Sequence, residues 1–260
     1  MIKQLLIAWT TIFVLINLTY LLSRKINNIS ILDIVWGFSF GALSIFFAFT
    51  GEGNAFRQWT LAVLTSLWSG RLGFYLAGRW MRYNGSEDPR YIELKKKWGN
   101  EKNLKILVFF YFQGLLIMLF SVIFAVPTWN KNDQIATLEI VGLGIVIIAL
   151  VGQCGADWQL SSFKKNVGSK EVCELGLWHY CRHPNYFFEW IIWIGFYLIA
   201  TASGAWWSIY CPASMLFLLL KVTGVPPSEA QSLKSKGANY NRYQKTTSCF
   251  IPFPRKKIKT

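Results

Sequence analysis

The side chains with the widest chemical range in this sequence are concentrated just before and within one apolar run. A cation, an imidazole, an amide, a phenol and a carboxylate fall within eight residues, namely Arg182, His183, Asn185, Tyr186 and Glu189. Pro184 favours the start of a helix, and Asn185 and Glu189 then share one helix face because they are four residues apart. A lone Arg or His at a membrane surface usually contacts lipid headgroups, but this set exceeds what anchoring requires. The stretch therefore predicts a ligand-binding site.

Ionisable residues inside apolar runs form a second group of candidates. A charge in hydrocarbon costs roughly 2.5–3.5 kcal/mol on insertion scales, so such residues face the protein interior and usually serve a function. Asp33 opens one run, three residues before Trp36, and Arg71 shares a helix face with Tyr75 in the next run. One interpretation is a structural ion pair between Asp33 and Arg71. The other is a polar pocket in which Asp33 and Tyr75 donate O–H groups to a ligand carbonyl, provided that burial keeps the carboxyl protonated.

The segment 79–105 combines a lysine run with an acidic pair. Its lysines at 95–97 suit contact with anionic lipid headgroups. The same interpretation does not explain Glu87, Asp88 and Arg90, because a surface that faces anionic lipid gains nothing from carboxylates.

The elements that position these residues are long apolar helices. The chain has 260 residues, of which 53% are hydrophobic and only 15% charged, whereas soluble domains average about 25% charged residues. This composition excludes a soluble globule, and the basic residues are too localised for a nucleic-acid-binding surface. Seven runs can each span a bilayer; they lie near 4–22, 31–50, 58–78, 106–127, 138–157, 185–202 and 205–222.

The distribution of basic residues predicts the topology. Of the 27 Lys and Arg residues, 23 fall in the segments 23–30, 79–105, 158–184 and 221–260, whereas Lys3, Arg57 and Lys131 fall on the opposite side. Lys and Arg accumulate in cytoplasmic loops. We therefore expect an all-α polytopic membrane protein with seven transmembrane helices, its N-terminus outside and its C-terminus in the cytoplasm.

The cysteine pattern argues against a structural metal site. Cys173, His179, Cys181 and His183 lie within eleven residues, but the usual zinc spacings are absent. An odd total of five cysteines without a Cys-x-x-Cys pair also argues against a disulfide framework. No Gly-x-Gly-x-x-Gly follows a strand pattern, which excludes a Rossmann domain. We expect no metal.

With these residues in view, the sequence resembles the steroid 5-alpha-reductase family, particularly its bacterial members. The run Arg182-His183-Pro184-Asn185-Tyr186 looks like the corresponding run of the sterol reductases. Arg71 and Tyr75 look like the family's Arg and substrate-contacting Tyr, and Asp33 stands where the family has a carboxylate. The resemblance is strongest over 150–254, where it rests on Asp157, Lys164, Gly176-Leu177, Asn185, Glu189, Tyr243 and Ile251-Pro252-Phe253.

The resemblance implies an NADPH-dependent reductase of the bacterial inner membrane that saturates the conjugated C=C of a 3-oxo-4-ene steroid or a similar lipid enone. It implies one membrane domain, 1–260, with substrate-side helices in 1–127 and a cofactor-binding half in 128–260 that faces the cytoplasm. Asp33 and Tyr75 are the expected catalytic residues, and Trp36 and Arg71 the expected substrate contacts. The expected cofactor contacts are Arg79, Arg90, Asp157, Lys164, Arg182, His183, Asn185, Tyr186, Glu189, Tyr240 and Tyr243.

Two other functions stay open at this point. The isoprenylcysteine carboxyl methyltransferases share Arg-His-Pro-x-Tyr and the Gly-x-x-Tyr-x-x-Tyr ending, so S-adenosylmethionine is the alternative cofactor. The segment 223–229 lacks the basic residues that sterol reductases carry there, and Ser228-Glu229 stands where the methyltransferases favour paired acidic residues. A non-enzymatic lipid-binding membrane protein is the third function, which the interior ionisable groups disfavour.

The predicted topology can be tested by labelling single cysteines introduced at Lys96 and Lys257. Both positions lie in segments that carry the excess of basic residues, so we expect labelling only from the cytoplasmic side. Labelling of intact cells from the periplasmic side would contradict the topology and the cytoplasmic cofactor site.

Overall fold

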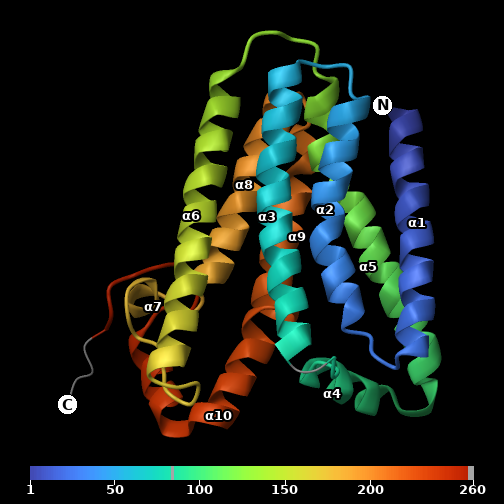
Figure 1. The fold of residues 1–260 in the computed structure, drawn as a ribbon. Coiled ribbons are helices and arrows are strands. Elements are labelled where there is room, and N and C mark those ends of the chain that lie inside the picture. The colour runs from blue at the N-terminus through green and yellow to red at the C-terminus, as the bar shows by residue number, and fades with distance from the viewer. Residues whose placement is uncertain (83–84, 257–260) are drawn as a thin grey trace. The chain divides into compact units, whose positions relative to one another are not determined.

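The computed structural model describes residues 1–82 and 85–256, and within these residues every regular element is a helix (Figure 1). The all-α prediction is therefore confirmed. The helices are α1 (Ile2–Lys25), α2 (Ile31–Thr50), α3 (Ala55–Arg82), α4 (Pro89–Trp98), α5 (Lys102–Ala125), α6 (Thr137–Asn166), α7 (Leu177–Tyr180), α8 (Pro184–Ala202), α9 (Tyr210–Phe217) and α10 (Val225–Thr246). Short 3-10 helices occupy Gly99–Glu101, Val126–Trp129 and Trp206–Ile209, and a π-helical turn occupies Leu218–Val222.

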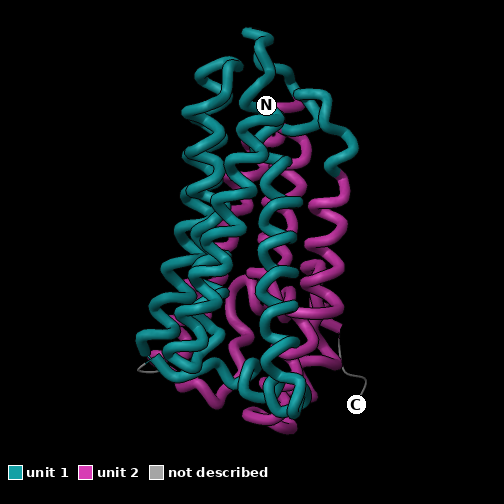
Figure 2. The backbone as a smooth tube through the Cα atoms, turned by 90° about the vertical axis from the view of Figure 1, so that its right-hand side faces the viewer, with its two compact units in different colours: residues 1–137, 200–208 teal, residues 138–199, 209–260 magenta. Residues whose placement is uncertain are grey.

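The chain divides into two compact units, which Figure 2 shows in different colours. Unit 1 consists of residues 1–137 and 200–208, and unit 2 of residues 138–199 and 209–260. The predicted substrate-side helices, 1–127, all belong to unit 1. Most of the predicted cofactor half belongs to unit 2.

Five helical stretches are long and apolar enough to cross a membrane: Ile2–Lys25, Ile31–Thr50, Pro89–Trp129, Thr137–Asn166 and Trp206–Thr246. They support a multi-pass membrane protein. Helices α3 and α8 cover the third and sixth predicted runs but are not among the five. α3 carries four arginines, and α8 carries Asn185, Glu189 and several Trp and Tyr residues, which lower its mean hydropathy. The count of seven spans and the orientation of the termini stay predictions.

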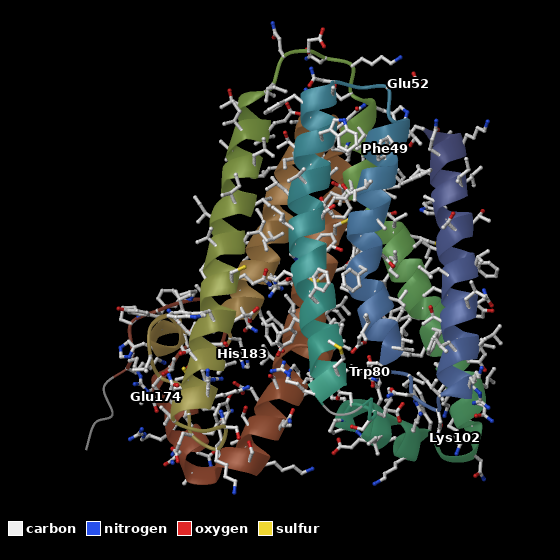
Figure 3. The ribbon with its side chains drawn as sticks, in the orientation of Figure 1. Phe49, Glu52, Trp80, Lys102, Glu174 and His183 are labelled. Carbon is white, nitrogen blue, oxygen red and sulfur yellow. The ribbon has the colours of Figure 1, made fainter. Side chains whose placement is uncertain are left out.

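Several helices continue beyond the apolar runs that predicted them. α6 extends to Asn166, nine residues past the expected end at Asp157, and α3 extends to Arg82. Helical hydrogen bonding continues into polar sequence when no proline or glycine ends it. In unit 1, Trp80 and Lys102 lie near one end, and Phe49 and Glu52 lie near the other (Figure 3).

Small residues allow α2 and α3 to approach each other closely within unit 1. A Cβ atom added at Gly37 would lie 3.0 Å from the Cα of Gly73, and one added at Gly73 would lie 2.7 Å from the ring of Phe38. The Ser69 hydroxyl donates to the Gly37 carbonyl at 2.5 Å. Gly41 follows Gly37 by four residues and also faces Ser69. This small-xxx-small pattern is typical of close helix pairs in membranes, and it fixes α2, which carries Asp33, against α3.

We expect Gly37→Ala to lower the stability of the protein although alanine favours helices. The added methyl would meet the Gly73 backbone, and overpacking of this kind costs about 1–3 kcal/mol. Gly78→Ala in α3 is the matched control, because its Cβ would meet nothing within 4 Å. The measurement is the apparent Tm in detergent. Equal Tm values for the two variants would contradict close packing at Gly37.

Candidate functional site

In unit 1, the polar residues around Asp33 form one connected network. Arg90 Nη2 lies 3.1 Å from Asp33 Oδ2, and the Tyr91 hydroxyl donates to Asp33 Oδ1. Arg90 Nε lies 3.0 Å from Asp88 Oδ1, and Arg79 Nη2 lies 2.5 Å from Asp88 Oδ2. Two carboxylates are thus held by two guanidinium groups and a phenol. This network joins α2, α3 and α4.

Glu87 and Asp88, the acidic pair in the basic segment 79–105, attach the start of α4 to the segment before α2. Asp88 caps α4 by accepting from the Arg90 backbone N–H at 2.9 Å, and its own N–H donates to the Ser30 hydroxyl. Glu87 accepts from the Ile29 N–H at 2.8 Å. Burial disfavours ionisation of Asp88, but the hydrogen bonds and charge of Arg90 together with the charge of Arg79 outweigh it, and the pKa of Asp88 lies below its ordinary value.

In unit 1, Asp33, Arg79 and Arg90 have partners that the sequence did not predict. One interpretation paired Asp33 with Arg71, and the other had Asp33 and Tyr75 donate to a ligand carbonyl; in the structure Arg90 and Tyr91 hold the Asp33 carboxylate. Arg79 and Arg90, the predicted phosphate contacts, are bound to carboxylates of unit 1. Helical periodicity relates residues on the same helix. It therefore could not show that Arg90, which lies on α4, contacts Asp33 on α2.

Of the residues predicted to contact substrate, Tyr75 is exposed, whereas Trp36 is packed against a neighbouring ring. Tyr75 is 48% exposed on α3. The Trp36 ring packs edge-on against Phe40, and its Nε1 has no hydrogen-bond partner among the described residues. A cavity of about 20 Å³ adjoins Asp33 and is lined by Ser30, Asp33, Leu76, Arg79, Trp80, Ser86 and Asp88. Such a volume accommodates about one water molecule and not a lipid enone.

In unit 2, a buried amide and a buried carboxylate meet between α6 and α8. Gln153 Nε2 donates to Glu189 Oε2 at 2.6 Å, and Trp193 Nε1 donates to Glu189 Oε1 at 3.2 Å. Gln153 is 2% exposed and Glu189 is 8% exposed. The bond to Glu189 orients the Gln153 amide, so its Oε1 points elsewhere. Gln153 Oε1 and Asn185 Oδ1 are buried without a hydrogen-bond donor among the described residues.

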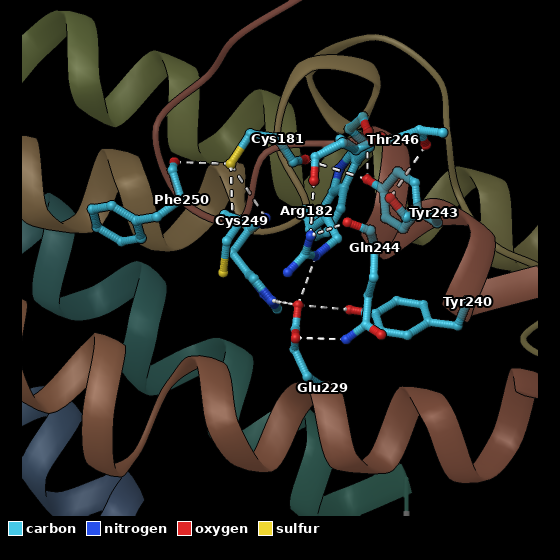
Figure 4. A network of polar contacts seen from close by, with 12 residues as sticks. Cys181, Arg182, Glu229, Tyr240, Tyr243, Gln244, Thr246, Cys249 and Phe250 are labelled. Carbon is cyan, nitrogen blue, oxygen red and sulfur yellow. Dashed lines mark hydrogen bonds and ion pairs between the residues drawn. The ribbon is translucent and has the colours of Figure 1, made fainter. Parts of the chain in front are cut away.

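Four side chains of unit 2 converge on Glu229 of α10 (Figure 4). Arg182 Nε lies 2.7 Å, His183 Nε2 3.2 Å and the Tyr240 hydroxyl 3.4 Å from Glu229 Oε1. Gln244 Nε2 donates to Glu229 Oε2 at 2.7 Å. The structure therefore brings together three predicted cofactor contacts from distant segments, around a carboxylate that sequence reasoning left unassigned.

Tyr243 has a different environment from Tyr240. Its hydroxyl donates to the Trp178 carbonyl and lies 3.3 Å from the Cys181 carbonyl. Tyr243 is 2% exposed, so it attaches the segment around α7 to α10 and presents no free polar group. Tyr186 stacks on His183 with ring centroids 5.4 Å apart.

Asp157 and Lys164 both lie in the last turns of α6. Lys164 is exposed and Asp157 half-buried. Neither belongs to the Glu229 cluster as the hydrogen bonds define it.

A metal ion does not suit the Glu229 cluster. His183, Glu229 and Cys249 offer ligand atoms within 4.8 Å of one another. However, the Arg182 guanidinium already lies 2.7 Å from Glu229 Oε1, and a second cation there would be repelled. Burial also raises the pKa of the Cys249 thiol, whereas a metal ligand must be a thiolate.

Sequence reasoning missed Gln153, Glu229, Gln244 and Tyr91. Each lies far along the chain from the residue that it contacts. Gln153 precedes Asp157 by four residues on a helix face that already carried one candidate, which was a usable signal. Glu229 gave a weaker signal, as part of the Ser228-Glu229 pair that stands where the methyltransferases favour acidic residues. Gln244 and Tyr91 gave none.

The fold and these three polar clusters define a helical, multi-pass membrane protein with buried ionisable groups. The model of the DUF1295 family, described as a protein of unknown function, matches residues 19–247, and the chain belongs to this family. An uncharacterised protein of Schizosaccharomyces pombe is 26% identical over 233 residues, which are 76% of this chain and 66% of the relative. The chain thus covers just under two thirds of that relative's length. No solved structure matches the chain.

We expect Asp88→Asn to loosen α4. Asparagine can still cap the helix, but it removes the charge that faces the guanidinium groups of Arg79 and Arg90, and hydrogen bonds to charged groups are worth about 1.5–3 kcal/mol. Hydrogen exchange of the amides in 86–98 should quicken severalfold at neutral pH. Asp133→Asn, at an exposed loop carboxylate, is the control. Exchange equal to the wild type would contradict the attachment of α4 by Asp88.

The lowered pKa of Asp88 also gives a pH dependence with a definite sign. The stabilisation that Asp88 contributes is complete above its unfolded pKa of about 4, and it is lost as the pH falls through the lower folded value. The Asp88→Asn variant should lack this acid-dependent loss.

Proposed function

We propose that this chain is a membrane-embedded NADPH-dependent reductase that saturates the conjugated C=C of a 3-oxo-4-ene steroid or a similar lipid enone. The observation that carries the proposal is two buried acceptor oxygens without a donor among the described residues, Gln153 Oε1 and Asn185 Oδ1; the Gln153 amide is bonded to Glu189 through its Nε2. A buried acceptor without a donor costs about 1–3 kcal/mol, and a ligand that supplies donors recovers this cost.

The nicotinamide end of NADPH fits these oxygens chemically. Its carboxamide has two N–H donors and one carbonyl acceptor, so the two N–H groups match Gln153 and Asn185. Glu189 holds the Gln153 amide in the required orientation by accepting its Nε2 at 2.6 Å. Gln153 therefore joins Asn185 and Glu189 as a proposed contact of the nicotinamide.

The polyanionic end of NADPH requires cations and donors, which unit 2 offers in Arg182, His183 and Tyr240. Lys164 and Asp157 at the end of α6 are the proposed contacts of the adenosine phosphate and ribose. Tyr186 and Tyr243 act as supports, since the first stacks on His183 and the second anchors the Trp178 carbonyl. Arg79 and Arg90 are less suited to phosphate because carboxylates of unit 1 already neutralise them.

When bound, NADPH supplies the hydride for the β carbon of a conjugated ketone. The residues of unit 1 are then proposed to act on the ketone oxygen, where negative charge develops. Tyr75 is the O–H donor, with Trp36 and Arg71 as substrate contacts. Asp33 accepts from Tyr91 and Arg90, so we place it as the group that positions these two donors.

A methyltransferase that uses S-adenosylmethionine is the second candidate. The Glu229 carboxylate favours it, because an anion within the binding cluster suits a cofactor with a positive sulfonium and ammonium. In either case the proposed setting is the bacterial inner membrane, with a lipid-soluble substrate from the bilayer and the cofactor from the cytoplasm.

The proposal is tested by titrating purified protein in detergent with NADPH and, separately, with S-adenosylmethionine. We expect NADPH to bind, and Gln153→Ala and Asn185→Ala each to weaken it roughly 3–10-fold, the equivalent of one hydrogen bond. Asn166→Ala, exposed on the same helix as Gln153, is the control.

Binding of S-adenosylmethionine and not NADPH would replace the reductase by a methyltransferase. Unchanged NADPH affinity in both Gln153→Ala and Asn185→Ala would instead contradict a contact between these side chains and the nicotinamide.

A further inference from the structure

The side chains assigned to the cofactor's phosphates are held, in this structure, by a carboxylate of the chain itself. Arg182, His183 and Tyr240 all reach Glu229 Oε1, and Gln244 reaches Oε2. A guanidinium, an imidazole, a phenol and an amide form the donor set that proteins use for phosphate. The cluster therefore has the composition of an anion-binding site whose anion is Glu229.

We propose that Glu229 is an internal anion that occupies a phosphate subsite of unit 2 and is displaced when a phosphate group of the cofactor binds. The inference rests on the proposed function for the identity of the cofactor. In this inference Glu229 competes with the cofactor phosphate for the same donors and does not bind the cofactor itself.

Arg182 is positioned independently of Glu229, which allows the subsite to persist after displacement. Its Nη1 donates to the Gln244 carbonyl at 2.9 Å and to the Thr247 carbonyl at 2.8 Å. Its backbone N–H donates to the Ser248 carbonyl at 2.8 Å. Of the Arg182 contacts drawn in Figure 4, the one to Glu229 is made by Nε. A phosphate oxygen can therefore take the place of Glu229 Oε1 without moving the guanidinium.

His183 is likewise held from another side. Its ring stacks on Tyr186 with an interplanar angle of 9°, and the side chain is only 5% exposed. Both side chains need an acceptor at all times, because an unpaired buried guanidinium is strongly unfavourable and an unpaired ring N–H loses a hydrogen bond. Glu229 meets this need in the free protein, and a phosphate meets it in the complex.

A purely structural role predicts the opposite consequence for ligand affinity. If Glu229 only braces α10, its loss should leave Arg182 poorly oriented and should weaken phosphate binding. If Glu229 competes, its loss should strengthen phosphate binding, since the ligand no longer has to displace a charged group.

The experiment compares Glu229→Gln with the wild type in detergent, with inorganic pyrophosphate and NADPH as the two probes. Glutamine keeps the size of the side chain and removes the charge. We expect each probe to bind at least about tenfold more tightly, with the pyrophosphate gain independent of the nicotinamide. Glu174→Gln is the matched control, because Glu174 pairs with Arg242 and Arg255 in the same unit, and it should leave both affinities unchanged.

Unchanged or weaker pyrophosphate binding in a folded Glu229→Gln variant would overturn the inference. Should that variant not fold, Glu229→Asp is measured in the same way; it keeps the charge on a shorter side chain and should give a smaller gain, whereas no gain would overturn the inference. Tighter pyrophosphate binding without any NADPH binding would support the internal anion and reject NADPH as the cofactor.

Discussion

The ion pair between Arg182 and Glu229 joins two segments that lie 47 residues apart in the chain. Around it, the polar end of unit 2 is assembled from the segment before α8, from α10 and from the chain that follows α10. Arg182 contributes to all three, because it also donates to the carbonyls of Gln244 and Thr247. Tyr243 adds the second connection, from α10 to the Trp178 carbonyl. Without the carboxylate, a buried guanidinium would lack its charged acceptor.

The same constraint explains the local structure of unit 1. Asp33 and Asp88 are mostly buried, and each receives a guanidinium group from Arg90. The short polar helix α4 is held by these contacts, which provide a reason for the acidic pair and for Arg90 in an otherwise basic segment. Charges that leave water need partners, and in this protein the partners come from segments between the long helices.

Apolar runs alone predicted the long helices, because a bilayer requires about 20 apolar residues in each span. They did not predict where the helices end, since α6 continues through polar residues to Asn166. The cofactor candidates Arg182, His183 and Tyr240 were identified from residue type and resemblance. Their common partner Glu229 was not, because spacing along one helix carries no information about contacts between segments.

For the same reason the sequence offered Arg71 as the partner of Asp33, whereas the structure gives Arg90. Gln153 lay within reach of sequence reasoning, one helical turn before Asp157. Its oxygen, which has no donor among the described residues, is the main support for the proposed nicotinamide contact.

The most direct test of the reductase is isotope transfer from NADPH deuterated at the transferring C4 position of the nicotinamide to a 3-oxo-4-ene steroid. We expect mass spectrometry of the saturated ketone to show one deuterium at the former β carbon, with oxidised cofactor formed in equal amount. Saturated product without deuterium, or no product from a protein that binds NADPH, would contradict hydride transfer to an enone.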